Sequence, residues 1–496
     1  MEILNETFKE KPRNLWKGVN GCKYQNYVTI SSTKSEEIDD KIIYIEDLEK
    51  RKEVYGICGE CNEPGTGWSW CRLCNSKRFK ENFKNWTSGN KDIDELLQHS
   101  QLNAVHYRNC LEWIPFENFQ HVTYITRGGF GKIYSAEWPE GCVLYWDIEN
   151  QKWHKYTNIK VALKSLDNSS DISTDFLNEI KSHLEIYLFD IIRCYGITQD
   201  PNTKDYMMVL KYCEDGNLRN YYLKNPEEND MKISILSSIA DGLLGIHNAG
   251  KVHKDFHLGN ILVHDGTVYI SDLGMCQSAN NEEQSTSNRV YGVLPYMAPE
   301  VLRGYQYIKA ADIYSFGIIM NEYFSEEIPF NGVPHDHILA IKICKGLRPK
   351  ISEDTPKLVA DLIMKCWDVK AENRPTSKEL SQILRKWNEE IYDNYDSEIY
   401  SQMEKYKKIR INKLKTRLGE NKSENVKTHP QAIYTSRLLN YKNLPEPVSS
   451  SNPSSFQFNS DAIPSTSANP ISECLDVQLT ELDLNEIGEK ENNVER

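Results

Sequence analysis

The sequence predicts an α+β fold in a chain that contains more than one domain. A strand, a flexible glycine turn and a second strand are expected at Ile125–Tyr134, and a further apolar strand that ends in a lysine at Val161–Lys164. A helix with apolar residues follows at Phe176–Ile180. The 496 residues exceed what one hydrophobic core can organise, so we expect regions on both sides of the main fold.

Composition and charge exclude two broad classes of protein. The 72 acidic residues outnumber the 59 basic ones and give a net charge of −13, so we expect no nucleic-acid partner. No stretch of about 18 apolar residues occurs, so we expect no membrane span. Met1–Asn5 has neither the basic nor the apolar region of a signal peptide. These observations predict an intracellular, cytoplasmic protein whose 13 cysteines lie in a reducing compartment.

Four cysteines are spaced as a metal site within residues 51–80. Cys58-x-x-Cys61 and Cys71-x-x-Cys74 are separated by nine residues, so four thiolates can converge on one ion. The segment has few apolar residues, and zinc would supply about 10 kcal/mol or more toward its folding. Four protein ligands leave no open coordination position, so we expect structural Zn²⁺. Two disulfides or a redox dithiol are the alternatives. The other cysteines are expected to be small packing residues.

Two further regions precede or interrupt the main fold. After an N-terminal segment at 1–50 and the cysteine knuckle, residues 81–118 are expected to be a helical linker. Apolar residues at helical spacing, such as Ile93 and Leu97, predict one or two amphipathic helices within 75–114. Their apolar face should dock on the following domain or on the knuckle, with a partner protein as the alternative. The long stretch Trp138–Asn158 predicts an elaborated hairpin.

Three polar residues have the spacing that a phosphoryl-transfer site needs. Asp255 and Asn260 lie in the segment His253–Asn260, and Asp272 follows shortly after. Such a site requires a carboxylate that accepts the proton of the attacking hydroxyl. It also requires an amide oxygen and a second carboxylate that hold Mg²⁺ (or Mn²⁺) on the nucleotide phosphates. The sequence therefore predicts a nucleotide-dependent transferase site in this region.

These segments resemble the catalytic and metal-binding loops of the eukaryotic protein kinase catalytic domain. The resemblance continues through Gly292–Glu300, Asp312–Gly317 and Asn373–Thr376, and it covers about residues 119–388. It implies the two-lobed protein kinase fold, with a small β-rich N-lobe and a larger helical C-lobe. It also implies a buried ion pair between Glu300 and Arg374, and hydrogen bonds from the backbone of the catalytic loop to Asp312.

The resemblance implies transfer of the γ-phosphate of ATP to a protein substrate. Asp255 would be the catalytic base and Asn260 and Asp272 the metal ligands, while Lys164, paired with Glu179, would orient the phosphates. Taken alone, Glu179 could be a solvated helix charge and the glycine-rich loop an ordinary hairpin. The residues expected to contact the nucleotide are Thr126, which stands in place of the usual first glycine, Gly128, Gly129, Phe130, Gly131, Ile133, Ala162, Lys164, Glu179, Leu210, Lys211, Cys213, Leu262 and Asp272.

Acceptor specificity is less clearly marked. The motifs are similar to those of the tyrosine-kinase-like group, which favours serine or threonine as the acceptor. His257 and Val293 replace the lysine and threonine that usually mark such kinases. The chain is also similar to a large family of fungal kinase-like proteins with an upstream four-cysteine knuckle. The alternatives are a pseudokinase scaffold, a tyrosine or dual-specificity kinase, and a metal-dependent nucleic-acid adaptor. The motifs imply no oligomeric state.

The C-terminal region changes character twice. Residues 389–445 form a tail in which Tyr400–Arg417 is rich in Lys and Arg and predicts a basic helix with a solvated face. A nucleic-acid or membrane site is the alternative for that helix. Residues 446–496 are expected to be disordered, because the stretch 447–472 is dominated by Ser, Pro and Asn and buries too little apolar surface to offset chain entropy.

Overall fold

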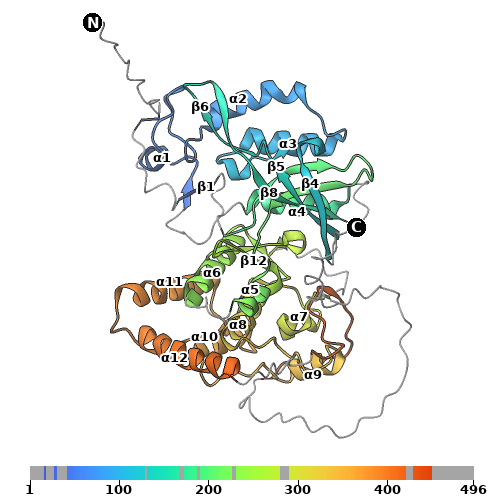
Figure 1. Cartoon of the computed structure of the whole chain (residues 1–496), viewed down its shortest axis with the longest axis vertical. Coiled ribbons are helices and arrows are strands. Elements are labelled where there is room, and N and C mark those ends of the chain that lie inside the picture. The colour runs from blue at the N-terminus through green and yellow to red at the C-terminus, as the bar shows by residue number, and fades with distance from the viewer. Residues whose placement is uncertain are drawn as a thin grey trace, which may run out of the picture. The chain divides into compact units, whose positions relative to one another are not determined.

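The computed structural model describes residues 16–17, 27–30, 42–128, 131–166, 172–186, 190–225, 231–279, 290–419 and 428–448. They belong to one compact unit, Met1–Pro453. A sheet-based lobe is followed by a helical lobe (Figure 1), which confirms the predicted two-lobed α+β fold. Among the described helices, none combines the length and the apolar character that crossing a bilayer requires.

A six-stranded sheet forms the N-lobe. Its strand order is β3-β9-β10-β8-β5-β4, with bounds β3 (Glu112–Trp113), β4 (Gln120–Gly128), β5 (Gly131–Trp138), β8 (Ile159–Leu166), β9 (Cys194–Gln199) and β10 (Tyr206–Lys211). Side chains alternate across β8 because successive residues of a strand point to opposite faces. Val161 and Leu163 are fully buried in an apolar cluster with Trp138. The opposite face of β8 therefore presents Ala162 and Lys164.

The linker helices dock on the N-lobe through their apolar face. Helices α2 (Arg72–Asn82) and α3 (Lys91–Asn103) lie in the region for which the sequence predicts one or two amphipathic helices, although α2 begins before residue 75. Ile93 and Leu97 of α3 are fully buried, and they cluster with Phe176 and Ile180 of helix α4 (Thr174–Glu185). The apolar spacing read from the sequence therefore serves packing against the following domain.

The long insertion is a hairpin on which the cysteine knuckle rests. Strands β6 (Cys142–Asp147) and β7 (Lys152–Tyr156) pair antiparallel, as predicted. Trp153 of β7 stacks on Phe79 of α2 at 4.8 Å between ring centroids and lies 5.9 Å from Trp70 of the knuckle. The guanidinium of Arg78 lies 4.2 Å from the ring centroid of Trp146. Trp146 and Trp153, the tryptophans of this otherwise polar insertion, thus form the surface on which the knuckle and α2 pack.

The C-lobe is mainly helical (Figure 1). Its helices are α5 (Leu218–Lys224), α6 (Lys232–Asn248), α7 (Pro299–Leu302), α8 (Lys309–Ser325), α9 (His337–Cys344), α10 (Lys357–Cys366), α11 (Ser377–Asp393) and α12 (Glu398–Gly419). Two of these helices, α6 and α8, are buried along most of their length. Short strands hold the loops of the site: β11 (Lys251–Val252), β12 (Ile261–His264), β13 (Thr267–Ile270) and β14 (Gln277–Ser278). The pairs β11–β14 and β12–β13 fix the catalytic and metal-binding loops side by side.

Smaller elements complete the described chain. The N-terminal segment contains β1 (Val28–Ile30), β2 (Ile42–Tyr44) and α1 (Leu48–Tyr55). Single turns of 3₁₀ helix occur at Phe83–Asn85, Tyr107–Asn109, Phe116–Asn118, Leu258–Asn260, Leu273–Met275, Leu294–Tyr296 and Ala371–Asn373. Helices α2 and α11 run across the proposed domain boundaries at residues 80 and 388, so these boundaries do not coincide with breaks in secondary structure.

The region after the kinase-like motifs packs on the C-lobe. Helix α12 matches the predicted basic helix, but only one of its faces is solvated, and the other face packs on the C-lobe. Ile399, Met403 and Tyr406 are buried in the C-lobe core, and the hydroxyl of Tyr406 donates to Phe324 O at 2.8 Å. This burial follows from the apolar residues spaced at i, i+4 and i+7 among the charges.

A second C-terminal segment, residues 428–448, carries strand β16 (Arg437–Leu439). It pairs antiparallel with β15 (Val290–Gly292) of the loop that follows Asp272. Residues 446–448, which the sequence assigns to a disordered tail, contact the C-lobe: Val448 N donates to Cys344 O at 3.0 Å. The remainder of that predicted tail, 449–496, lies outside the described residues.

Candidate catalytic and metal sites

A buried lysine joins two carboxylates at the centre of the N-lobe face. Lys164 Nζ donates to Glu179 Oε1 at 2.7 Å and to Asp272 Oδ1 at 2.8 Å. The side chains of Lys164 and Glu179 are 8% and 2% exposed, so their charges interact with little screening by water. Burial alone would lower the pKa of Lys164, but the carboxylates of Asp272 and Glu179 outweigh it and raise that pKa. The ammonium is therefore fixed in its charged form.

Local backbone features permit this three-way contact. Helix α4 begins at a capped end, where Ser173 Oγ accepts from Phe176 N at 3.1 Å, and this cap sets the position of Glu179 one turn later. Asp272 lies in the left-handed region at φ 59°, an uncommon conformation for a non-glycine residue. A Cβ at Gly274 would approach Glu179 Oε2 to 3.0 Å, so glycine lets the two loops meet.

Asp255 and Asn260 are held together in the catalytic loop. Asn260 Nδ2 donates to both the main-chain oxygen and Oδ2 of Asp255, each at 2.9 Å. Asn260 O accepts from Ser271 N at 2.8 Å and from Ser271 Oγ at 2.9 Å. Because Ser271 directly precedes Asp272, these bonds place the two candidate metal ligands on adjacent, hydrogen-bonded segments.

Asp312 is the support beneath the catalytic loop. Its carboxylate accepts from His253 N at 2.8 Å, from Lys254 N at 3.1 Å and from the hydroxyl of Tyr307 at 3.0 Å. These bonds confirm the expected role of Asp312, and they stabilise Lys254 in a left-handed conformation at φ 70°. The imidazole of His247 contributes a further contact at 3.0 Å.

A buried ion pair closes the lower side of the same lobe. Arg374 makes two hydrogen bonds to the carboxylate of Glu300, at 2.6 and 2.9 Å, and the Arg374 side chain is fully buried. This confirms the pair expected from the sequence. Removing one partner would leave an unpaired buried charge, which typically costs about 3–5 kcal/mol.

His257 lies beside the candidate base. Its Nε2 is 3.5 Å from Asp255 Oδ1, and its Nδ1 accepts from Gly259 N at 3.0 Å. Burial raises the pKa of Asp255, but the charge and hydrogen bonding of His257 and the hydroxyl of Ser436 bring it below its ordinary range. His257, which replaces the lysine usual in serine/threonine kinases, thus lies next to the candidate base itself.

The residues expected around the nucleotide are distributed over both lobes. Within the sheet, Thr126 pairs with Ile133 and Gly128 with Gly131, and Ile133 lies opposite Lys164. Ala162 pairs with Leu210 on the neighbouring strand. Lys211 is the last residue of β10, and its ammonium contacts the hydroxyl of Tyr269 at 3.1 Å. Cys213 follows that strand and is buried, and Leu262 lies on β12 of the C-lobe. Gly129 and Phe130 fall outside the described residues.

The four knuckle thiols converge. The Sγ atoms of Cys58, Cys61, Cys71 and Cys74 all lie within 4.8 Å of one another. Four sulfurs at about 2.3 Å from one tetrahedral zinc ion would be separated by roughly 3.8 Å, so the observed cluster fits such an ion. Cys71 also precedes α2 as its N-cap residue, so the metal ligand and the start of the helix are the same point of the chain.

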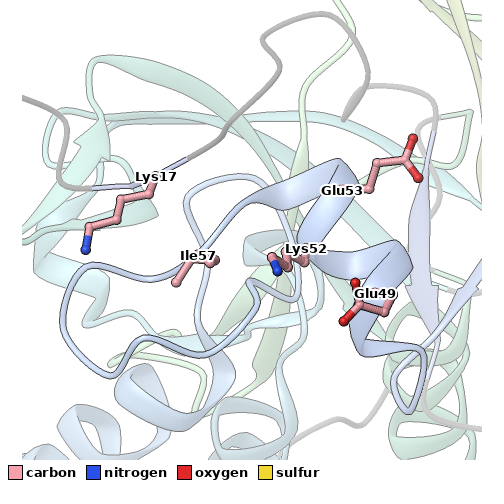
Figure 2. Close-up of a pocket in the computed structure, with 5 residues that line it drawn as sticks. All are labelled: Lys17, Glu49, Lys52, Glu53 and Ile57. Carbon is pink, nitrogen blue, oxygen red and sulfur yellow. The ribbon is translucent and has the colours of Figure 1, made fainter.

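A surface depression elsewhere does not share these features. It has a volume of about 360 Å³ and is lined by Lys17, Glu49, Lys52, Glu53 and Ile57. Figure 2 shows the charged ends of Lys17 and Glu53 pointing away from one another. Without converging polar groups it is a weaker candidate for a ligand site than the region around Lys164 and Asp255.

Ser436 is the site residue that sequence reasoning missed. Its Oγ donates to Asp255 Oδ2 at 2.5 Å, although 181 positions separate the two residues. No motif or composition signal marks this serine, which lies in a segment assigned to the tail. The segment reaches the catalytic loop through tertiary contacts, among them the pairing of β16 with β15.

Comparison with known proteins gives one family and many relatives. A model of the protein tyrosine and serine/threonine kinase family matches residues 119–384, which are more than half of the chain. A Dictyostelium discoideum protein named "Probable LIM domain-containing serine/threonine-protein kinase" is 31% identical over 40% of this chain and 30% of its own length. The ankyrin repeat-containing protein kinase A of the same organism is 29% identical over 48% of this chain and 17% of its own.

A human relative belongs to the tyrosine-specific proteins by name. The tyrosine-protein kinase TXK of Homo sapiens is 26% identical over 53% of this chain and 48% of its own length. The chain therefore spans less than half the length of these three curated relatives.

Proposed function

The chain belongs to the protein tyrosine and serine/threonine kinase family, and on that premise we propose that it transfers the γ-phosphate of ATP to hydroxyl groups of a protein substrate. The observation that carries this proposal is the contact of Lys164 with both Glu179 and Asp272, in a chain whose catalytic loop also presents Asp255. A fold kept only for binding would have no use for this costly arrangement of buried charges.

Each polar residue has a role that its surroundings support. Lys164, held by Glu179, presents its ammonium to the nucleotide phosphates and positions them. Asp255 accepts the proton of the acceptor hydroxyl, and Asn260 fixes the orientation of that carboxylate through its hydrogen bond to Oδ2. Asn260 and Asp272 offer the hard oxygen donors that Mg²⁺ or Mn²⁺ prefers, and the ion would neutralise phosphate charge. Catalysis then rests on positioning and electrostatics.

The nucleotide would lie between β5, β8 and β10 and the strand β12. Ile133, Ala162, Leu210 and Leu262 supply an apolar surround for a flat base, and Gly128 and Gly131 bring backbone N–H groups close to the phosphates. The side chain of Lys211 is engaged with Tyr269, so we assign to this residue a structural contribution at the edge of the site.

Serine or threonine is the favoured acceptor. One of the relatives compared above carries serine/threonine-protein kinase in its name. The motifs also resemble the tyrosine-kinase-like group. A tyrosine or dual-specificity acceptor and a pseudokinase scaffold are the competing functions. The complete set of base, lysine and metal-ligand candidates supports catalysis over a scaffold.

We extend the proposal to a structural zinc ion held by the four knuckle cysteines and to a cytoplasmic location. The clustered thiols support both, because thiolates of this kind persist in a reducing compartment. The purified chain should contain about one zinc per molecule. Cys58→Ser should release it, whereas Cys366→Ser in the C-lobe should retain it, and a metal-free chain with a folded knuckle would contradict the zinc assignment.

The transferase function is tested with labelled ATP, magnesium and dephosphorylated casein. Wild-type chain should label casein, and acid hydrolysis should yield phosphoserine and phosphothreonine. Asp255→Asn should lower the rate by orders of magnitude, while Asp265→Asn, which changes an exposed carboxylate of the same lobe, should leave it unaltered. Equal rates for wild type and Asp255→Asn would overturn the assignment, and phosphotyrosine as the sole product would reassign the acceptor.

A further inference from the structure

Residues 428–448 are held against the face where a protein substrate must bind. In Figure 1 this red-brown segment runs beside α7 and α9. Strand β16 adds to β15, with Arg437 opposite Gly292 and Leu439 opposite Val290. β15 lies between the metal-binding loop and α7, so a strand paired with it has an extended backbone alongside the catalytic loop, as a bound peptide would.

The segment is fastened by several independent contacts. On one side of the strand, His335 N donates to Gln431 O at 2.9 Å, and Arg437 Nη2 donates to His335 O at 2.6 Å. The side chain of Leu439 is 3% exposed and belongs to the C-lobe core. Further along, the carboxylate of Glu446 forms an ion pair with Arg303. The position of the residues between these anchors is therefore defined by packing as well as by strand pairing.

These anchors bring one hydroxyl to the candidate base. Ser436 Oγ donates to Asp255 Oδ2 at 2.5 Å. The preceding Thr435 is exposed to solvent, and the hydroxyl of Tyr434 is engaged with Pro329 O at 2.8 Å. Of three consecutive hydroxyl-bearing residues, only Ser436 makes the hydrogen bond that an acceptor makes before it is phosphorylated.

We propose that Ser436 is an autophosphorylation site, and that the site of the same chain phosphorylates it. This inference rests on the proposed kinase function. Ser436 Oγ would form a bond to the γ-phosphorus of ATP while the bond from that phosphorus to the β–γ bridging oxygen breaks. The hydroxyl proton passes to Asp255, and ADP leaves. The only co-reactant is the ATP that the proposed function already uses.

The reaction also changes what the segment does. Before transfer, β16 and Ser436 occupy the place of an external protein substrate and so compete with it. After transfer, a phosphate with nearly two negative charges lies beside the buried carboxylate of Asp255, and this repulsion disfavours the docked arrangement. Transfer to external substrates should therefore show a lag that preincubation with ATP removes.

The test uses the full-length chain, treated with phosphatase and then incubated with ATP and magnesium. Mass spectrometry should find close to one phosphate per chain on Ser436, and the half-time should be unchanged over a tenfold dilution. Ser436→Ala should lose this phosphate, whereas Thr435→Ala, the neighbouring exposed hydroxyl, should keep Ser436 phosphorylated.

A parallel assay with casein distinguishes autophosphorylation of Ser436 from kinase activity toward other proteins. Labelled casein with no phosphate on Ser436 would overturn the inference and leave the kinase function standing. Absence of label on both would overturn both. A rate on Ser436 that falls in proportion to dilution would overturn transfer within one chain, because the acceptor would then come from a second copy.

Discussion

The nucleotide side and the peptide side of the Asp255 carboxylate are built differently. On the nucleotide side, the buried Lys164 and Glu179 meet the half-buried Asp272 through short contacts, and all three lie within residues 119–384 that match the family. On the peptide side, Ser436 and β16 come from beyond that match and reach the site by strand addition. The proposed chemistry thus belongs to the domain that matches the family, whereas the segment that we propose to control access to it lies outside that match.

The two sides also differ in how they tolerate change. A buried ion pair loses most of its value when one partner is removed, because the other charge stays unpaired. A docked strand instead opens locally, and the free energy of that opening is set by the few contacts that hold the strand. Substitutions on the nucleotide side should therefore abolish transfer, and substitutions on the peptide side should redistribute it between Ser436 and external substrates.

The largest effect is expected on the nucleotide side. Lys164→Met removes the ammonium that positions the phosphates, and kcat should fall by about 10²–10³-fold or more. Lys155→Met, on the hairpin β7, should retain the wild-type rate. Steady-state transfer to casein measures both, and a Lys164→Met variant with more than a tenth of wild-type kcat would show that the lysine does not serve this role.

An intermediate effect is expected on the peptide side. Leu439→Ala removes a buried anchor of β16, at a cost of about 2 kcal/mol or more to docking, whereas the adjacent Leu438 is 46% exposed. Because the docked segment competes with substrate until Ser436 is phosphorylated, Leu439→Ala should lower the apparent KM for casein by up to roughly 30-fold in initial-rate assays of phosphatase-treated chain, with kcat unchanged. Leu438→Ala should behave as wild type. Equal KM values for the two variants would contradict docking at the substrate site.

The smallest effect concerns pH on the nucleotide side. Burial, followed by the charge of Lys164, lowers the pKa of His183 on α4 to about 3. Below the unfolded value of about 6.5 the unfolded chain binds a proton that the folded chain does not, so stability is complete above about pH 7 and falls as the pH decreases toward 3. Between about pH 7.5 and 5.5 this histidine should account for a loss of about 1.4 kcal/mol.

The contribution of His183 is measured by comparing variants. His183→Gln should lose less stability than wild type over that pH interval in urea unfolding. His99→Gln, at an exposed position of α3, should lose as much as wild type. If the His183 variant and wild type lost stability in parallel, the buried neutral histidine would not explain the acid sensitivity.

Sequence predicted the nucleotide side because its residues are ordered along the chain. Lys164, Asp255 and Asp272 follow one another in motifs whose spacing reflects the fold. The helical spacing of Ile93 and Leu97 likewise predicted an apolar helix face, and both side chains are buried. The glycine-rich turn at Gly129 and Phe130 lies outside the described residues, so its expected place over the phosphates stays a prediction.

The peptide side could not be predicted in the same way. Ser436 has no neighbouring signal, because its contact with Asp255 depends on β16 pairing with a strand far away in the sequence. Likewise, the basic composition around α12 concealed Ile399, Met403 and Tyr406, whose burial ties the supposed tail to the C-lobe. Long-range contacts of this kind are set by tertiary packing rather than by local pattern.

The central claim is that the base and its first acceptor hydroxyl belong to one chain. The most direct measurement mixes phosphatase-treated wild-type chain with an isotopically heavy Lys164→Met chain, adds ATP and magnesium, and follows phosphate on Ser436 of each by mass spectrometry. We predict rapid phosphorylation of Ser436 on the wild-type chain alone. Phosphorylation of the Lys164→Met chain at a comparable rate would contradict the claim.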